Sequence, residues 1–320
     1  MTPDFFPPDR FYCLLDEQPD YFIPPRLLRN REGYGALMIN PQCWFAWQGS
    51  APPDMAARAG LVDGFFETPW MVWVDDPATR ALNPFWLGPE LAHVLCGLRP
   101  GQPLPAGVLN EEQLAILWTA QIVVTPDHAA RRRRQWMEAA RSYAGQFPHG
   151  YVALDDLLHP FHLGALRRYF RHQTRTGRFH LGDDQAPGRY IAHNEPVTRF
   201  FHQQLTDLIS DVAGALVTPS YSYVTLYQGG SNLDPHTDRD QCEYTLSLCF
   251  DATPEPIAQI PWPLNLQTAE GPMSVWQHLG DGLLFRGRYL THWRDRLPEG
   301  QTASSILFHY VDQGFQGVYS

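Results

Sequence analysis

The chain has 320 residues, of which 44% are hydrophobic and 13% aromatic. This is the composition of a folded globular protein rather than of a disordered segment, and the length is sufficient for two hydrophobic cores. The formal net charge of -10 argues against nucleic acid as a partner, because phosphate binding requires a basic face.

Every positive side chain is an arginine, since the sequence contains no lysine. A lysine Schiff base and a phosphate-loop lysine are therefore excluded, and a buried anion must be bound by arginine or by neutral donors. The one basic run, Arg131 to Arg134, is expected to be a solvated helix face, with a docking site for an acidic partner as the alternative. The five cysteines form no CxxC pair, so neither a zinc ribbon nor a disulfide framework is predicted.

The sequence also gives no sign of a membrane protein. Its first residues, MTPDFFPPDRFY, carry acids and prolines where a signal peptide would have a basic and then an apolar stretch. No run of about 18 apolar residues occurs. We expect a soluble, cytoplasmic protein that does not bind membranes.

Residues 1–145 are predicted to form an N-terminal accessory or substrate-recognition module of small α+β, winged-helix-like type. Two short strands are expected around an Asn-Pro turn, and three helices follow, the last of them polar and connecting. The expected segments are 34–49 for the strands and 85–98, 111–124 and 127–146 for the helices.

Residues 146–320 are predicted to form a second domain, in which helices precede strands. Helices are expected over 159–173 and 195–216. From Pro219 onward the pattern favours strands at 220–228, 243–251, 280–287 and 304–311, with Gly, Pro and Asp turns between them. Helices that support two sheets indicate an α+β domain with a β-sandwich or jelly-roll core.

The segment YVTLYQGGSNLDPHTDRD carries the strongest chemical signal. A strand ends at Tyr227, a Gly-Gly turn follows, and His236 and Asp238 stand two positions apart. Residues i and i+2 of an extended segment point to the same side, so both can reach one metal ion. His292, in GDGLLFRGRYLTHWRD, can return beside them across a sandwich. Two histidines and one carboxylate form the facial triad of non-haem Fe(II) oxygenases, with positions left open for a keto acid and O₂.

HxD alone is weakly specific, because surface turns often contain it, and the surrounding pieces make the prediction specific. Residues 219–312 resemble the catalytic core of the prolyl 4-hydroxylase-like 2-oxoglutarate/Fe(II) oxygenases. The matching pieces are LYQGGSNLDPHTD, CEYTLSLCFD, GDGLLFRG, TH at 291–292, and ILFHYV, and the similarity extends over roughly 148–315. The resemblance implies a double-stranded β-helix that uses Fe(II), 2-oxoglutarate and O₂ and releases succinate and CO₂.

Residue by residue, the resemblance implies that His236, Asp238 and His292 are the metal ligands and the catalytic centre. It also implies that Tyr227 lines the 2-oxoglutarate pocket. Related halogenases leave the carboxylate position vacant for chloride, so the presence of Asp238 favours hydroxylation. Desaturation or cyclisation remains open.

One departure concerns the co-substrate. The family usually has a Lys or Arg shortly after the second histidine that holds the distal carboxylate of 2-oxoglutarate, but here that stretch reads EGQTASS. A buried dianion still needs a bidentate donor. Arg294 is the first candidate and Arg288 the second, because both share strand parity with His292, and Arg296 is less favoured. Ser304 or Ser305 could add a hydroxyl.

Four further residues are assigned more weakly. Arg189, Tyr190 and Asn194 are expected in a polar loop before the sandwich, where substrate contact is one interpretation. His309, in the last strand, is interpreted as a core histidine whose hydrogen bonds are satisfied.

The predicted function is a 2-oxoglutarate-dependent hydroxylase that acts on an amino-acid residue, a peptide or another small polar substrate. The N-terminal module makes a peptide or carrier-bound substrate more attractive than a free metabolite. One alternative is a non-catalytic jelly-roll that binds metal or peptide, which the absence of a Lys or Arg shortly after His292 favours. Another is a sensor or interaction protein whose N-terminal module binds the partner. The sequence does not predict the oligomeric state.

Overall fold

The computed structural model describes residues 6–15, 36–60 and 63–319. The chain divides into two compact units, one of Met1–Glu138 with Pro160–Ala165 and one of Ala139–His159 with Leu166–Ser320. Each unit has its own sheets. None of the helices within the described ranges is both long and apolar enough to span a membrane.

The N-terminal unit is α+β. It contains a three-stranded antiparallel sheet in the order β2-β3-β4 and a two-stranded antiparallel ladder of β1 with β5. The elements are β1 (Met38–Ile39), β2 (Cys43–Phe45), the 3-10 helix η3 (Ala46–Gln48), α2 (Pro53–Arg58), β3 (Met71–Asp75), β4 (Leu82–Trp86), α3 (Pro89–Leu95), α4 (Glu111–Thr119), β5 (Val123–Val124) and the first part of α5 (His128–Gln146), whose residues from Ala139 belong to the second unit.

The two strands predicted around the Asn-Pro turn are β1 and β2, although each pairs with a different partner. The helices predicted over 85–98 and 111–124 are shorter than expected. Phe85 and Trp86 end β4, and Val123 and Val124 form β5. These apolar residues are fully or almost fully buried, and a short apolar run does not distinguish a strand from a helix. The winged-helix-like character of this unit stays a prediction.

The second unit is built on two antiparallel sheets. The larger has the order β6-β14-β11-β16-β9-β8-β7 and the smaller the order β10-β15-β12-β13. The strands are β6 (Tyr151–Leu154), β7 (His180–Leu181), β8 (Arg189–His193), β9 (Val217–Gln228), β10 (Leu233–His236), β11 (Tyr244–Thr253), β12 (Leu264–Thr268), β13 (Gly271–Val275), β14 (Gly282–Phe285), β15 (His292–Arg294) and β16 (Thr302–Asp312).

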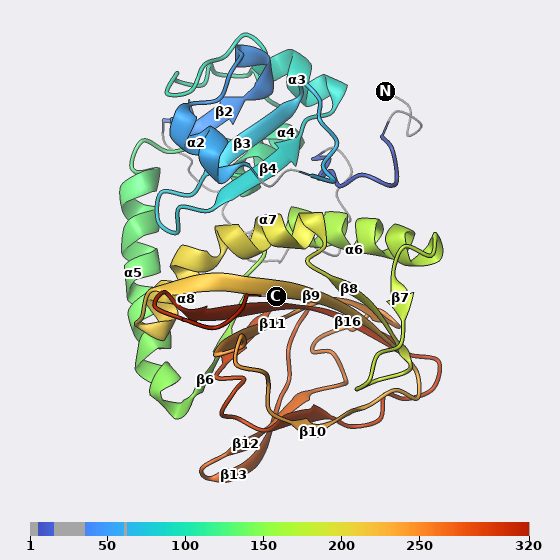
Figure 1. The fold of residues 1–320 in the computed structure, drawn as a ribbon. Coiled ribbons are helices and arrows are strands. Elements are labelled where there is room, and N and C mark those ends of the chain that lie inside the picture. Colours follow the sequence, from blue (N-terminus) through green and yellow to red (C-terminus); the bar gives the residue numbers. More distant parts are fainter. Residues whose placement is uncertain (1–5, 16–35, 61–62, 320) are drawn as a thin grey trace. The chain divides into compact units, whose positions relative to one another are not determined.

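From β9 onward the chain alternates between the two sheets, with β9, β11, β14 and β16 in the larger and β10, β12, β13 and β15 in the smaller. This winding is that of a double-stranded β-helix, as expected from the sequence. Figure 1 shows the smaller sheet on one side of the larger sheet and helices on the other. Leucines of both sheets, among them Leu266 and Leu283, meet with Phe285 in the apolar core between them.

Helices of this unit cover the outer face of the larger sheet (Figure 1). They are the later part of α6 (Pro160–Arg175), α7 (Pro196–Gln204) and α8 (Thr206–Ala213); the 3-10 helix η4 (Phe147–His149) precedes β6. The single helix predicted over 195–216 is in fact α7 followed by α8. Leu205 ends α7 with a φ of -85° and a ψ of -7°, and the Thr206 hydroxyl donates to the carbonyl of His202, a bond that bends helices.

The polar segment that begins at Arg189 was expected to be a loop, but it forms β8, an addition to the larger sheet. Its residues pair along their whole length with β9, from Arg189 opposite Tyr227 to His193 opposite Tyr223. The strand has no apolar alternation, so its partner rather than its own sequence pattern determines its conformation.

A buried ion cluster fastens α6 to the outer face of the larger sheet. Asp251 of β11 accepts hydrogen bonds from the guanidinium groups of Arg167, at 2.8 Å, and of Arg171, at 2.7 Å. The Arg167 and Asp251 side chains are only 4% and 7% exposed. Buried charges of this kind contribute to stability only while all partners are present.

We therefore expect Asp251→Ala to lower the free energy of unfolding by about 3 kcal/mol, because it removes a buried carboxylate partner of the buried Arg167 charge. Denaturant unfolding measures this change. Glu299→Ala is the control, since it removes an exposed pair with Arg296 and should cost less than about 1 kcal/mol. Equal effects of the two substitutions would contradict a structural role of the buried cluster.

Candidate functional site

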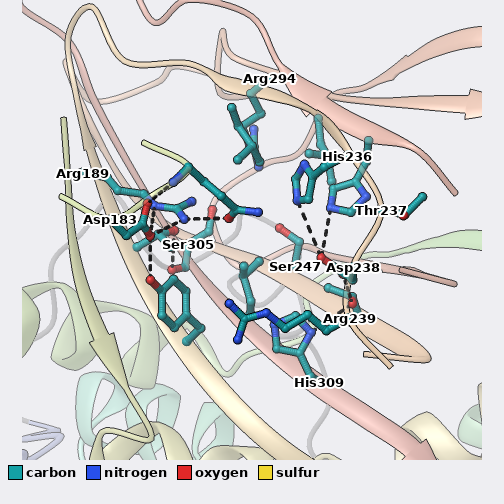
Figure 2. Close-up of a pocket in the computed structure, with 18 of the residues that line it drawn as sticks. Asp183, Arg189, His236, Thr237, Asp238, Arg239, Ser247, Arg294, Ser305 and His309 are labelled. Carbon is teal, nitrogen blue, oxygen red and sulfur yellow. Dashed lines mark hydrogen bonds and ion pairs between the residues drawn. The ribbon is translucent and has the colours of Figure 1, made fainter. Parts of the chain in front are cut away.

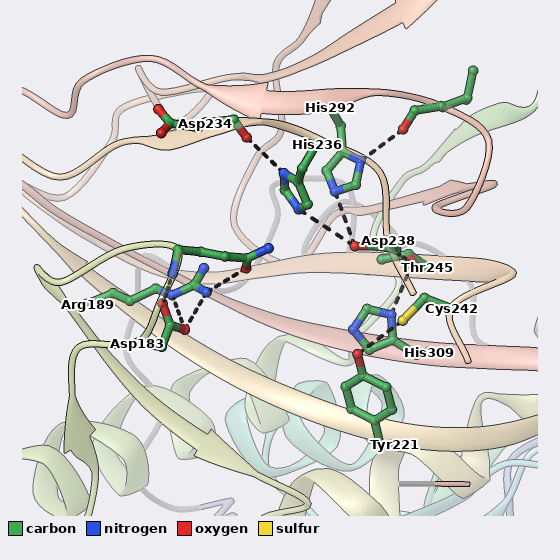
Figure 3. A network of polar contacts seen from close by, with 12 residues as sticks. Asp183, Arg189, Tyr221, Asp234, His236, Asp238, Cys242, Thr245, His292 and His309 are labelled. Atoms are coloured by element: carbon green, nitrogen blue, oxygen red, sulfur yellow. Dashed lines mark hydrogen bonds and ion pairs between the residues drawn. The ribbon is translucent and has the colours of Figure 1, made fainter. Parts of the chain in front are cut away.

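The site begins with a register between two short strands of the smaller sheet. β10 and β15 are antiparallel, and His236 lies directly opposite His292. Directly opposed residues on one face of a sheet have neighbouring side chains. The two imidazole rings are accordingly 4.3 Å apart between centroids (Figure 3).

Asp238 follows His236 by two residues and joins both histidines. Its Oδ1 atom is 3.7 Å from Nε2 of His236 and 3.6 Å from Nε2 of His292. The three ligand atoms all lie within 4.8 Å of one another. The structure therefore brings together the three residues that the HxD motif and the later histidine suggested.

Hydrogen bonds orient both imidazoles for metal binding. Nδ1 of His236 is 2.8 Å from the carbonyl oxygen of Asp234, and Nδ1 of His292 is 3.0 Å from that of Leu290 (Figure 3). A carbonyl can only accept, so each Nδ1 carries the proton and each Nε2 presents a lone pair toward Asp238. This is the usual arrangement of metal-binding histidines. Burial also lowers the pKa of His292, which favours its neutral, ligating form.

Asp238 is held in place from two directions. Its backbone N–H donates to the carbonyl of Gly287 at 2.9 Å, and its Oδ2 accepts a hydrogen bond from the Thr245 hydroxyl at 2.7 Å. Position 287 cannot carry a side chain here, because a Cβ atom would lie 2.2 Å from Oδ2 of Asp238. Oδ1 is thus left free toward the two histidines.

Thr245 connects Asp238 to His309. Since the threonine hydroxyl proton is donated to the carboxylate, the contact of 3.0 Å between Thr245 Oγ1 and His309 Nδ1 requires the histidine to donate. Burial lowers the pKa of His309 to about 4, so the ring is neutral at neutral pH. His309 is buried with a satisfied Nδ1, as predicted for a core histidine, but it also lines the cavity described next.

The three residues face a cavity of about 200 Å³ between the sheets (Figure 2). Arg294 lines this cavity and is 5% exposed. Its guanidinium donates to the carbonyl of Trp262 at 2.6 Å and lies 4.7 Å from the centre of that indole ring. No carboxylate among the described residues pairs with it. An uncompensated buried charge of this kind suits an anionic ligand.

The other predicted co-substrate residues are placed differently. Tyr227 and Ser305 are buried and line the cavity. Arg288, by contrast, does not belong to the described residues that line it and instead forms an ion pair with Asp240 at 3.0 Å. Arg296 pairs with Glu299 in an exposed position.

Arg189, the first residue of β8, forms a polar network in the wall of the cavity. Its guanidinium donates to the Asp183 carboxylate and to the Tyr227 hydroxyl, and the Tyr223 hydroxyl donates to Asp183 at 2.7 Å (Figure 2). These bonds hold the pKa of Asp183 below its usual value, although burial opposes the shift. Arg189 is therefore neutralised within the protein, whereas Asn194, placed with it in the sequence, accepts a bond from the backbone of Ser222.

Sequence reasoning missed Thr245, Gly287 and Arg239 as residues of the site. Arg239 directly follows the HxD motif and lines the cavity. Thr245 could have been found from strand parity, because it points to the same face of β11 as Ser247, which also lines the cavity. Gly287 is the last residue of the segment GDGLLFRG, but only its contact with Asp238 in the folded chain explains why this position is glycine.

The donor set fits a divalent metal ion. Two neutral imidazole nitrogens and one carboxylate oxygen, held on one side of an accessible cavity, leave further coordination positions open, as non-haem Fe(II) sites do. Asp238, Cys242 and His309 form a second group of possible donors, but it shares Asp238, and burial raises the pKa of the Cys242 thiol to about 12. The His-Asp-His group is the better metal site.

No protein-family model and no curated protein matches the sequence. Solved structures do resemble it. A prolyl-4-hydroxylase from Pseudomonas putida aligns over 55% of this chain and 100% of its own, with 16% identity and a TM-score of 0.44. A prolyl hydroxylase from Trichoplax adhaerens, solved with a hypoxia inducible factor peptide fragment, aligns over 56% and 92%, with 15% identity and a TM-score of 0.47. A non-heme alpha ketoglutarate dependent epimerase from nogalamycin biosynthesis aligns over 55% and 83%, with 12% identity and a TM-score of 0.47. The chain is thus structurally similar, at low sequence identity, to 2-oxoglutarate/Fe(II) oxygenases that include prolyl 4-hydroxylases.

Proposed function

We propose that this protein is a 2-oxoglutarate- and Fe(II)-dependent dioxygenase that hydroxylates a carbon of an amino-acid residue, a peptide or a small polar molecule. The observation that carries the proposal is the convergence of His236 Nε2, His292 Nε2 and Asp238 Oδ1 at the edge of a cavity that also contains a buried, unneutralised arginine. His236, Asp238 and His292 would hold the iron. With 2-oxoglutarate, iron(II) supplies oxidative chemistry in which one O₂ atom enters a C–H bond and the other enters succinate as CO₂ leaves.

The residues of the chain have separate tasks in this function. The carbonyls of Asp234 and Leu290 keep the imidazoles in the tautomer that presents Nε2. Arg294 would bind the distal carboxylate of 2-oxoglutarate, with Tyr227 and Ser305 contributing hydroxyl groups. Asp238 occupies the carboxylate position, which favours hydroxylation over halogenation.

The first test is an anaerobic titration of the Fe(II) protein with 2-oxoglutarate, monitored by the weak visible charge-transfer band of the chelate. We expect the band in the wild-type protein and its loss in His292→Ala. Binding of iron without the band would instead favour a non-catalytic metal-binding jelly-roll.

The metal site is tested by His236→Ala and Asp238→Ala. Each removes one of three ligands, so we expect iron bound per chain, measured by metal analysis after dialysis, to fall from about one ion to near zero. A retained stoichiometry in both variants would exclude these residues as ligands.

Thr245→Val removes the hydroxyl that orients Asp238 while it keeps the shape of the side chain. We expect the affinity for Fe(II) or Co(II) to fall by about 10–100-fold, the usual effect of losing a hydrogen bond to a metal ligand. Thr245→Ser, which keeps the hydroxyl, is the matched control and should stay close to wild type. Wild-type affinity in the valine variant would show that Thr245 has no part in metal binding.

Arg294→Gln removes the charge assigned to the co-substrate. Loss of charge-assisted hydrogen bonds worth roughly 2 kcal/mol should raise the Kd for 2-oxoglutarate about 30-fold, measured by the same charge-transfer band. Arg288→Gln should have little effect, because Arg288 pairs with Asp240 and does not belong to the described lining of the cavity. The reverse order of effects would transfer the role to Arg288.

A further inference from the structure

Three arginines occur among the described residues that line the cavity, and they differ in how their charges are compensated. Arg189 is neutralised by Asp183. Arg294 is buried without a carboxylate partner and is assigned above to 2-oxoglutarate. Arg239 remains, and its guanidinium has neither a hydrogen bond nor an ion pair with any residue in the described ranges.

The position of Arg239 is defined by its surroundings. It follows Asp238 directly, lines the cavity and is exposed. Figure 2 shows its side chain beside His309, on the other side of the cavity from Arg294. Its positive charge contributes to lowering the pKa of His193, on β8, and of His309, on β16, after burial as the larger cause. The positive charge of Arg239 therefore has an electrostatic effect on residues of β8 and β16 that line the cavity.

The positive charge of Arg239 is not needed for the metal ion or for 2-oxoglutarate. A bound dication with the Asp238 carboxylate has a net charge of about +1, and Arg294 adds another, which the 2-oxoglutarate dianion neutralises. The positive charge of Arg239 is left over. Asp184, the remaining carboxylate of the described lining, is exposed and forms no ion pair with Arg239 within the described part of the chain.

Flat rings lie beside this charge. The His193 ring stacks on Tyr221 with centroids 5.0 Å apart, and the Tyr221 ring lies 4.4 Å from that of His309. All three line the cavity with Arg239. A guanidinium next to such rings can bind an oxyanion while the apolar part of the same ligand packs against the rings.

We propose that Arg239 binds an anionic group, a carboxylate or a phosphate, of the primary substrate, whose apolar part packs against Tyr221 and His193. The inference rests on the proposed function, because the primary substrate is defined as the molecule bound beside 2-oxoglutarate. The proposed role of Arg239 restricts the primary substrate to anionic molecules and excludes neutral or purely cationic ones.

The test uses the full chain loaded with Fe(II) under anaerobic conditions and saturated with 2-oxoglutarate, so that the Arg294 site is filled. Benzoate and phenyl phosphate are the anionic probes, benzamide is the neutral probe, and saturation-transfer NMR titrations give their Kd values. We expect one of the anions to bind more tightly than benzamide. Whichever anion binds more tightly distinguishes a carboxylate from a phosphate site.

Arg239→Gln should raise the Kd of the preferred anion by at least roughly tenfold, because it removes a charged hydrogen-bond donor. Arg239→Lys should retain part of the affinity, and the binding of benzamide should not change. Arg199→Gln is the matched control, since Arg199 is exposed on α7 and is not one of the described residues lining the cavity.

Equal anion binding in wild type and Arg239→Gln, or no binding of either anion to the wild type, would overturn the inference. So would loss of the 2-oxoglutarate band in Arg239→Gln, because Arg239 would then serve the co-substrate. In each of these cases the wild-type band persists. Failure of the proposed function is a different result, since the wild type itself would then lack the band.

Discussion

The candidate site depends on the register of two short strands, in which His236 lies opposite His292. Successive side chains of a strand alternate between faces, so a slip of one residue in either strand would turn one imidazole away from the cavity. β15 is also held by β12 on its other side, where Leu266 lies opposite His292. Asp238 then reaches both rings because its backbone bonds to Gly287, which has no side chain to block the approach.

The cavity is less acidic than the protein as a whole, because three arginines and three aspartates occur in its described lining. The chain carries a net charge of -10, yet Arg239 and Arg294 face the cavity without carboxylate partners within the described structure. Because there is no lysine, both cations are planar guanidinium groups, which bind carboxylates and phosphates in a fork geometry. Guanidinium groups without carboxylate partners can bind anions even in a protein whose net charge is negative.

The sequence predicted the parts of the structure that depend on local pattern. The period-two alternation identified β9 and β11, strands were predicted at β14 and β16 as well, and the spacing of His236 and Asp238 indicated a shared metal ion. What it could not predict depends on tertiary pairing. β8 forms because β9 lies beside it, and Arg288 and Arg294 share strand parity, so only the folded chain separates the one in the cavity from the one paired with Asp240.

β10 is an edge strand of the smaller sheet and has only two paired positions in its ladder with β15. An ion held by His236, Asp238 and His292 would fasten this edge strand and the segment after it to β15. Occupancy of the site would then be coupled to local opening of the strand, because the ion binds the closed form only. The backbone amides of residues 233, 234 and 236–238 would exchange with solvent more slowly in the loaded protein than in the metal-free protein, while those of the long central strands of the larger sheet would change little.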